Sequence, residues 1–365
     1  MARPYVRMTR RYADDLRLFR GGWAKLGLGL GLVAYLFLPY VLVDDFWLSV
    51  LNYAGIAAIG AIGLNLLTGY TGQVSLGHAF FIGAGAYTAA HVGGELDWAF
   101  PLWLIAAIVI GAFIGAVIGP FALRLRGNYL AIVTLGLVFI GEHLFRNLDG
   151  LTGGNSGTSV LAPVEIFGLD FANLTLGGED FSLNQGYFWL IWGVVILATL
   201  LAKNLVRTRP GRAMQAVRDR DVAAEIIGVR LGRYKVGAFA VSSGLAAAGG
   251  ALYGSYQQFV SPDEWSLFLS IQYIAIIIVG GIGTIFGAVV GAVVLGGMPG
   301  LIDRYSDSIP FVATSARDDG FISVFSLNQA IFGLLIVLFL VFEPRGLAAV
   351  WLRTKAYFRS WPFSY

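Results

Sequence analysis

The feature that most limits how this chain can fold is a series of apolar segments, each about as long as a bilayer is thick. Overall, 57% of the residues are hydrophobic and only 13% are charged, whereas about a quarter of an ordinary soluble domain is charged. A segment that crosses lipid must satisfy its own backbone polar groups, and a helix does so. The sequence therefore predicts an all-α, polytopic integral membrane protein. About ten transmembrane helices are expected, at residues 24–43, 47–67, 75–91, 99–123, 128–145, 187–202, 236–259, 267–281, 285–301 and 326–342.

The lysines and arginines favour one side of this pattern. If the N-terminus is cytoplasmic and the spans alternate, the inner segments 1–25, 124–127, 203–235 and 343–365 hold 22 of the 25 Lys and Arg residues. Cytoplasmic loops carry such an excess, so the basic pI does not indicate a nucleic-acid partner. We expect both termini in the cytoplasm, with a basic segment (1–25), a transmembrane domain (26–342, its first helix retained) and a C-terminal tail (343–365).

Two glycine-rich hairpin tips and two rows of small residues stand out within the transmembrane domain. The tips, at 68–74 and 280–287, are either turns or re-entrant breaks, because irregular backbone at membrane depth must line a cavity or be buried in protein. The rows Gly111, Gly115, Gly119 and Gly283, Gly287, Gly291 have the four-residue spacing that permits close helix contact. Static packing is the simpler interpretation of these rows.

The sequence lacks the motifs of several enzyme classes. No G-x-x-x-x-G-K-[ST] phosphate-binding loop occurs, the three histidines lack the H-E-x-x-H spacing, and there are no cysteines. We therefore expect no metal site, no cofactor and no ATPase site in this chain, and an intramembrane enzyme is the least favoured hypothesis.

Charged and histidine side chains are scarce inside the predicted spans, and Glu142, His143 and His78 lie there. An ion-coupled carrier usually binds its ion or proton at such a group in mid-membrane. Glu142 lies four residues before Arg146, which predicts a helical ion pair, and His78 is expected to bond to a neighbouring carbonyl. Neither pattern indicates a proton relay. An ion-coupled secondary carrier remains the alternative of a different class.

The inner stretch 203–235 predicts a helical hairpin outside the membrane. Pro210 suits a helix start and Gly228 a helix end, and either Asp219 or Asp221 could cap a second short helix. The second helix has one apolar face, formed by Val222, Ala223, Ile226 and Ile227. Such a face can lie on lipid headgroups or in a groove of a partner protein, and the residues alone leave both options open.

Five blocks along the chain carry a recognisable signature. They read GLNLLTGYTGQVSLGHAFF at 63–81 (continuing GAGAYTA at 83–89), LRGNYLAIVTL at 125–135, LTGGNSG at 151–157, PGRAMQAVRDRDVAAEIIG at 210–228, and GGIGTIFG at 280–287 followed by PRGL at 344–347. In this order they closely resemble the branched-chain amino acid ABC transporter permeases of the LivM type, over roughly residues 47–350. Urea and short-amide permeases share this architecture, and Gln73 favours amino acids over them.

The resemblance implies a specific assembly in the cytoplasmic (inner) membrane of a bacterium or archaeon. Such permeases pair with a second homologous permease, two cytoplasmic ATP-binding subunits and an external substrate-binding protein, and no nucleic acid is involved. The outer loop 146–186 becomes a candidate contact for the binding protein. The segment 210–228 resembles the coupling helix that docks on the ATPase, with Arg212, Arg218, Asp219, Val222, Ala223, Glu225, Ile226, Ile227 and Gly228 as its candidate residues.

The substrate would pass between helices, because selectivity in this family comes from the external protein. Polar residues of the predicted spans and hairpin tips are the candidates for this pathway. They are Asn65, Gln73, Ser75, His78, Tyr87, Thr134 and Gln272.

Overall fold

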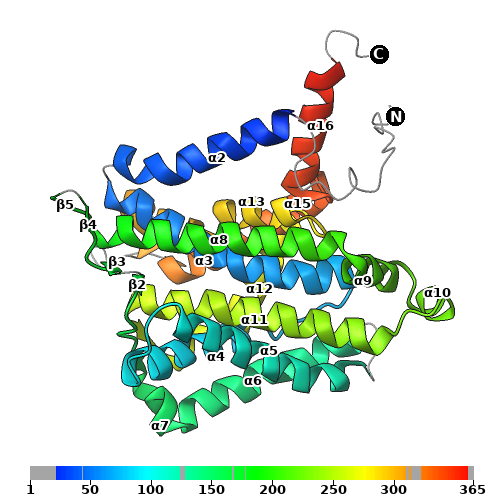
Figure 1. Ribbon diagram of the computed structural model, residues 1–365, viewed down its shortest axis with the longest axis horizontal. Helices are drawn as coiled ribbons and strands as arrows, with labels where there is room; N and C mark the ends of the chain where they lie inside the picture. Colours follow the sequence, from blue (N-terminus) through cyan, green and yellow to red (C-terminus); the bar gives the residue numbers. More distant parts are fainter. Residues whose placement is uncertain are drawn as a thin grey trace.

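The computed structural model describes residues 22–42, 44–123, 128–166, 168–176, 178–309, 312–313 and 322–360. Long helices dominate these residues and lie side by side in a bundle (Figure 1). The helices are α2 (Gly22–Val41), α3 (Asp45–Leu64) with η1 (Asn65–Tyr70), α4 (His78–Thr88) with η2 (Ala89–Glu95), α5 (Leu102–Leu123), α6 (Asn128–Asn147), α7 (Asp149–Thr152), η3 (Gly154–Ser156), α8 (Leu183–Arg207), α9 (Arg209–Asp219), α10 (Asp221–Ile226), α11 (Leu231–Gln257), η4 (Pro262–Trp265), α12 (Leu267–Gly280), α13 (Ile285–Gly296), α14 (Met298–Tyr305), η5 (Ser306–Ser308), α15 (Val324–Phe342) and α16 (Gly346–Ser360).

The all-α, polytopic class is confirmed. Each of the ten predicted ranges overlaps a helix, although 285–301 spans α13 and the start of α14 and 75–91 begins before α4. Seven helices of the described residues are long and apolar enough to cross a membrane. α12 is shorter, as is the apolar stretch Gly29–Val41 of α2, and α4 continues into η2. The number of crossings and the side on which the termini lie therefore stay predictions. The predicted inner segments 1–25 and 124–127 fall mostly or wholly outside the described residues.

Helix α11 forms the centre of the bundle, because small residues let α3, α4 and α5 approach its backbone closely. A Cβ on Gly85 of α4 would lie 2.0 Å from the Ala247 carbonyl oxygen, and one on Gly250 of α11 would lie 1.8 Å from that of Ile82. Each helix thus carries a glycine where the other's backbone meets it, the contact that small residues permit in membrane proteins.

The two rows of small residues have the packing role predicted for them. Gly111 and Gly115 of α5 meet Ser243 of α11, and Gly291 of α13 meets Gly280 at the end of α12. By contrast, large apolar side chains face outwards on α5 and α15, where Phe113 is 68% exposed and Phe342 is 77% exposed. Such an apolar exterior suits lipid contact.

The predicted outer loop 146–186 contains short ordered elements. They are α7, η3 and the two-residue strands β1 (Thr158–Ser159), β2 (Glu165–Ile166), β3 (Leu169–Asp170), β4 (Thr175–Leu176) and β5 (Glu179–Asp180). β1 pairs with β6 (Phe259–Val260), which follows α11, and β7 (Val312–Ala313) pairs with β8 (Ile322–Ser323). The β1–β6 pair ties this loop to the bundle core.

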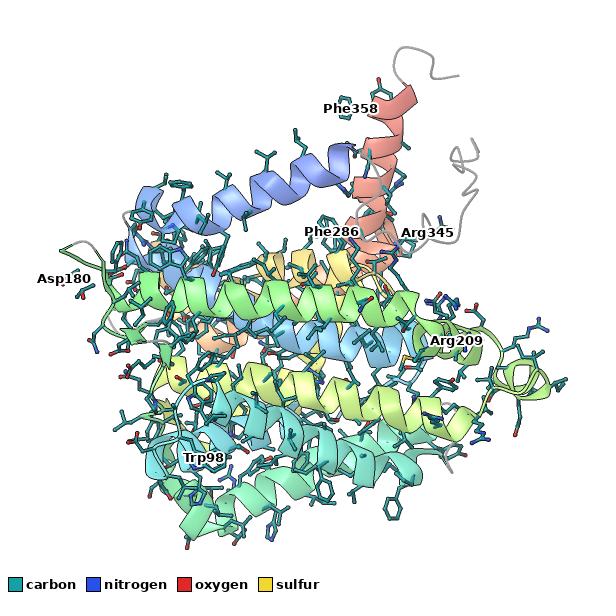
Figure 2. The ribbon with its side chains drawn as sticks, in the orientation of Figure 1. Trp98, Asp180, Arg209, Phe286, Arg345 and Phe358 are labelled. Carbon is teal, nitrogen blue, oxygen red and sulfur yellow. The ribbon has the colours of Figure 1, made fainter. Side chains whose placement is uncertain are left out.

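The two ends of the bundle differ in character. Strands β2 to β5 lie at one end, while α9 and α10 project from the other (Figure 1). Figure 2 places Asp180 and Trp98 at the strand end and Arg209 at the opposite end. The α9–α10 hairpin is therefore well separated from the loop 146–186.

Candidate functional site

The first predicted glycine-rich tip is a genuine break in the helix. The chain leaves η1 at Tyr70 and becomes helical again only at His78. Gly72 has a φ of +73°, the left-handed region that favours glycine. A Cβ at this position would also lie 3.1 Å from Cγ of Arg218 in α9. The turn therefore requires glycine both for its backbone conformation and for the close approach of α9.

The second tip separates α12 from α13 by four residues, 281–284. Gly281 and Gly283 have φ values of +123° and +78°. Thr284 then caps α13, since its side-chain oxygen accepts the N–H of Gly287 at 3.2 Å. Both tips are thus irregular segments between helices, and whether either re-enters the membrane stays a prediction.

Asn65, the first predicted pathway residue, joins the two breaks. Its Oδ1 accepts the N–H of Gly283 at 2.8 Å, and its Nδ2 donates to the carbonyl oxygen of Thr284 at 2.8 Å. The residue is only 1% exposed. A Cβ on Gly69 would lie 2.2 Å from this Oδ1, so glycine at 69 makes the approach possible.

Arg218 of α9 binds the same place. Its Nη1 donates to the Gly69 carbonyl oxygen at 2.7 Å and lies 3.1 Å from the position that a Cβ on Gly283 would take. Two helix breaks far apart in sequence are therefore fastened to each other and to α9. We call the set of Asn65, Gly69, Gly72, Gly283 and Arg218 the glycine junction.

Two further helices attach to the junction region. Gln73 donates from Nε2 to the carbonyl oxygen of Lys235 in α11, at 3.3 Å. At the other break, a Cβ on Gly346, the first residue of α16, would lie 2.6 Å from the backbone nitrogen of Gly281. A displacement of the junction would thus be transmitted to α11 and α16 as well as to α3, α9 and α13.

The hairpin next to the junction has the predicted form. α9 begins at Arg209 with Pro210 in its first turn, α10 follows directly, and Gly228 has a φ of +89°. The predicted cap is wrong: Arg220 occupies the N-cap position of α10 in an extended conformation, without a side-chain cap. The Asp221 carboxylate instead accepts the N–H of Val222, at 2.9 Å.

The predicted apolar face of α10 is exposed in this chain. Val222, Ile226 and Ile227 are 62%, 81% and 76% exposed, while Ala224 on the opposite face is buried. Ala223, Glu225 and Gly228 are also exposed. Of the predicted coupling residues in α9, Arg212 donates to the Arg207 carbonyl oxygen and Asp219 accepts from Arg218 Nε at 3.1 Å.

Three of the remaining candidate pathway residues bond to backbone groups between helices and turns. His78 Nε2 lies 3.0 Å from the Gly60 carbonyl oxygen, as predicted. Thr134 of α6 accepts the N–H of Leu76 at 2.9 Å, and Ser75 accepts that of Gly77 at 3.3 Å. The Thr134 bond holds the segment between η1 and α4 against α6, the Ser75 bond stabilises the turn within that segment, and the His78 bond joins α4 to α3. A packing role accounts for all three.

Tyr87 and Gln272 lie apart from the junction. Tyr87 of α4 is 6% exposed and packs against Trp265 of η4, with ring centroids 6.3 Å apart. Gln272 is half-buried on α12. The candidate pathway residues therefore do not gather in one place, and their role as a pathway lining stays a prediction.

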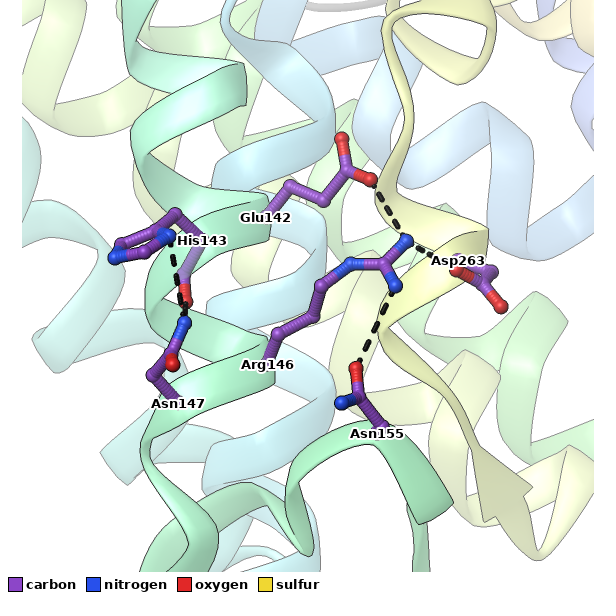
Figure 3. Close-up of polar contacts among 6 residues, drawn as sticks. All are labelled: Glu142, His143, Arg146, Asn147, Asn155 and Asp263. Atoms are coloured by element: carbon purple, nitrogen blue, oxygen red, sulfur yellow. Dashed lines mark hydrogen bonds and ion pairs between the residues drawn. The ribbon is translucent and has the colours of Figure 1, made fainter.

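The predicted Glu142–Arg146 ion pair is confirmed and forms part of a larger group (Figure 3). Arg146 Nη2 lies 2.9 Å from Glu142 Oε1 and 2.5 Å from Asp263 Oδ1, and Nη1 donates to Asn155 Oδ1 at 3.5 Å. Arg146 thus fastens α6 to η3 and η4. This arrangement accounts for Glu142 as a structural residue.

Sequence reasoning missed two features of this architecture. The bond between Arg218 and Gly69 joins residues 149 positions apart, and no local pattern signals it. Glu264 and Trp265 were not selected either, although Ser261-Pro262-Asp263-Glu264 carries a readable signal. It is a capping box in which Ser261 and Glu264 each satisfy the other's backbone N–H.

Comparison with known proteins agrees with this architecture. The model of the family described as "Branched-chain amino acid transport system / permease component" matches residues 46–340. The chain is 34% identical to the high-affinity branched-chain amino acid transport system permease protein LivM of Salmonella typhimurium and 33% identical to that of Escherichia coli, over 64% of this chain in each case. These matches span 58% of the length of each relative.

More distant relatives extend the likeness. The probable branched-chain amino acid transport permease protein LivM of Methanocaldococcus jannaschii is 23% identical over 82% of this chain and 92% of the relative. No solved structure matches the chain. Because the family model covers most of the chain, including every residue of the glycine junction, this multi-pass membrane protein belongs to the branched-chain amino acid transport system permease family.

Proposed function

We propose that this chain is the transmembrane permease subunit of an ATP-driven importer for branched-chain or other hydrophobic amino acids. Two of the relatives named above are high-affinity branched-chain amino acid transport permeases, and the motifs at 63–81 and 210–228 fall within the matched region. The relatives' names favour this substrate class over urea or short amides. The chain would act in a bacterial or archaeal cytoplasmic membrane and carry no ATPase site of its own.

The observation that carries the proposal is the contact between an exposed docking hairpin and two helix breaks. The side chains of Val222, Ile226 and Ile227 on α10 are exposed, and exposure of such an apolar face to water is unfavourable in free energy. α9, joined to it through Arg220, binds the glycine junction through Arg218. Movement of a partner bound to α10 would therefore be transmitted through α9 to Gly69 of η1, and through Asn65 to the break between α12 and α13.

The partner at α10 is best explained as a cytoplasmic ATP-binding subunit. A short helix with an apolar face fits a groove on a protein surface. The hairpin belongs to the stretch 203–235, which holds more Lys and Arg residues than any other predicted inner segment, and such an excess is typical of the cytoplasmic side. In the proposed complex, a second permease forms the substrate pathway together with this chain. A second ATP-binding subunit supplies ATP hydrolysis together with the first. An external binding protein would dock on the loop 146–186 at the opposite end (Figure 1).

The docking assignment is tested by a double substitution, Ile226→Asp with Ile227→Asp. Carboxylates in place of two exposed isoleucines would leave the bundle unchanged but make burial in an apolar groove very costly. We expect uptake of radiolabelled leucine by the reconstituted complex to fall at least about tenfold, because the loss of two apolar contacts of about 1.5 kcal/mol each already exceeds that factor. The amount of chain inserted in the membrane should not change.

A matched control is Phe358→Asp. Phe358 is 73% exposed, like the two isoleucines, but lies on α16 away from the hairpin (Figure 2). Uptake by this control should stay close to wild type. Normal uptake by the double variant would rule out the assignment of α10 as the docking helix.

A further inference from the structure

Helix α16 turns away from the bundle directly after α15, the last of the candidate membrane spans. Its first turn is packed, since Ala348 is buried and a Cβ on Gly281 would lie 3.0 Å from the Cβ of Ala348. From residue 350 to residue 358, by contrast, every side chain is exposed. In Figure 1, α16 (red) runs across the direction of the long helices α8 and α11. A helix that starts at the end of a span and runs across the spans has the direction of a helix that lies along a membrane surface.

Contacts within the chain hold α16 in this direction. Gly346, its first residue, has a φ of +70°, the left-handed region that favours glycine. Arg353 forms an ion pair with Glu343, the C-cap residue of α15. The ring of Trp351 lies 6.2 Å from that of Phe286 in α13. The transverse position of α16 is therefore set by its turn and its neighbours.

The side chains of α16 divide into two unlike faces. At 3.6 residues per turn, six of them fall within an arc of about 120°, and we call this arc the aromatic face of α16. Its members are Leu347, Val350, Trp351, Thr354, Tyr357 and Phe358. Only Thr354, at the middle of the arc, is not apolar or aromatic. Arg353 and Lys355 flank the arc on its two sides, and Leu352 lies on the opposite side of the helix.

The composition of this face fits lipid head groups better than water. Trp351 is 55% exposed and Phe358 is 73% exposed, which is unfavourable in water for rings of this size. Tryptophan and tyrosine are enriched where membrane and water meet, because each has an apolar ring and a polar tip. Lys355 can lay its apolar stem along such a boundary while its ammonium group reaches phosphate.

The charge of the region selects the kind of lipid. Residues 344–365 include four basic residues and no acidic one, and basic groups beside a membrane are attracted to anionic head groups. Gly346 packs on Gly281, at the break that Arg218 of α9 also reaches through Gly283, so α16 starts at the α9 end of the bundle. From there α16 runs away from the α9–α10 hairpin (Figure 1). A partner bound to α10 would therefore leave this face uncovered.

We propose that the aromatic face of α16 inserts among the head groups of anionic phospholipids at the membrane surface. The inference goes beyond the proposed function, because it assigns a lipid contact that requires no partner protein. The contact would anchor the C-terminal end of the chain and, through Gly346, the break at Gly281. It lies outside the docking hairpin, and the other residues of the face remain in Phe358→Asp, so that control should still import normally.

The test reads lipid contact directly. The chain contains no cysteine, so a single introduced cysteine carries a fluorophore at one known position. Thr354→Cys places a nitrobenzoxadiazole probe at the middle of the aromatic face. Leu352→Cys is the matched control, because it is exposed on the same helix but lies on the opposite side. The full chain is reconstituted in phosphatidylcholine vesicles with or without phosphatidylglycerol, and each vesicle carries a lipid with a nitroxide quencher near its head group.

We expect at least about twofold more quenching at Thr354 than at Leu352 in phosphatidylglycerol vesicles, because the apolar face of a surface helix lies about 5–10 Å into the head-group boundary. Quenching at Thr354 should be weaker in phosphatidylcholine alone. Adding Lys355→Gln should lower the ratio of quenched to unquenched probe at Thr354 about fivefold, the factor that corresponds to the attraction of one basic residue near an anionic surface. Arg233→Gln removes the same charge from α11, where Arg233 is exposed, and should leave the ratio unchanged.

Three outcomes would overturn the inference. Equal quenching at Thr354 and Leu352 would show that the aromatic face does not meet lipid. Equal losses in Lys355→Gln and Arg233→Gln would refute the attraction between α16 and anionic head groups. A probe at Thr354 that stays unquenched in vesicles and becomes shielded only when ATP-binding subunits are added would assign the face to a protein partner instead. None of these results depends on whether the chain imports an amino acid, so the proposed function would stand or fall separately.

Discussion

Replacing Arg218 with glutamine should uncouple ATP hydrolysis from transport without dismantling the protein. The substitution removes the charged donor that reaches the Gly69 carbonyl oxygen at 2.7 Å. A hydrogen bond to a charged group contributes about 1.5–3 kcal/mol to stability. Because the Arg218 side chain is 40% exposed, solvent screening reduces this to about 1–1.5 kcal/mol. At about 1.4 kcal/mol for each factor of ten, the coupling between α9 and the junction should fall about five- to tenfold.

The assay is the number of leucine molecules imported per ATP hydrolysed by the complex in proteoliposomes. Arg212→Gln is the matched control, because it removes the same charge from the same helix, while its Nη1 bonds only to the Arg207 carbonyl oxygen of its own segment, at 3.0 Å. We expect the ratio to fall for Arg218→Gln and to stay near wild type for Arg212→Gln. Equal ratios in the two variants would refute the idea that Arg218 transmits movement from α9 to the helix breaks.

Three other variants probe packing, energy source and charge. Gly250→Ala should lower the free energy of unfolding by about 1–3 kcal/mol, because its Cβ would lie 1.8 Å from the Ile82 carbonyl oxygen of α4. The control Gly237→Ala, in the same helix, places its Cβ in open space. Equal melting temperatures of the two variants in a fluorescence melt would contradict this. Glu142→Gln should leave ATP-driven uptake within about twofold of wild type, since Arg146 keeps Asp263, and a complete loss of uptake would instead favour an ion-coupled carrier. Burial raises the pKa of Glu264, so its contribution to stability is largest in acid and is lost as the pH rises through that raised pKa. Glu264→Gln should therefore melt at or above the wild-type temperature at neutral pH, and a lower melting temperature there would contradict the sign of this shift.

The positions of the helices could be predicted because a membrane helix depends on little beyond the length and apolarity of its own segment. The hairpin at 203–235 could be predicted for a similar reason: Pro210 and Gly228 are local signals of helix ends, and the structure has a helix start and a left-handed glycine there. The cap of α10 could not. Asp219 and Asp221 were both candidates for the N-cap of α10. In the structure Arg220, which lies between them in an extended conformation, occupies the N-cap position without a side-chain cap.

The functional geometry was harder to predict because it depends on contacts between distant segments. Asn65 could be selected as polar within an apolar span, but not its two bonds to residues 283 and 284, which lie more than 200 positions away. The rings of Tyr53, Tyr87, Tyr253 and Trp265 likewise come together from four separate elements. Polar residues in a membrane protein are thus readily noticed in the sequence, while their partners appear only in three dimensions.

The most direct test of the central claim is leucine uptake into proteoliposomes that contain either this chain alone or the chain with its second permease, ATP-binding subunits and external binding protein. The proposed function predicts uptake only in the complete complex and only with ATP. Leucine uptake by the chain alone, driven by an ion gradient, would contradict it.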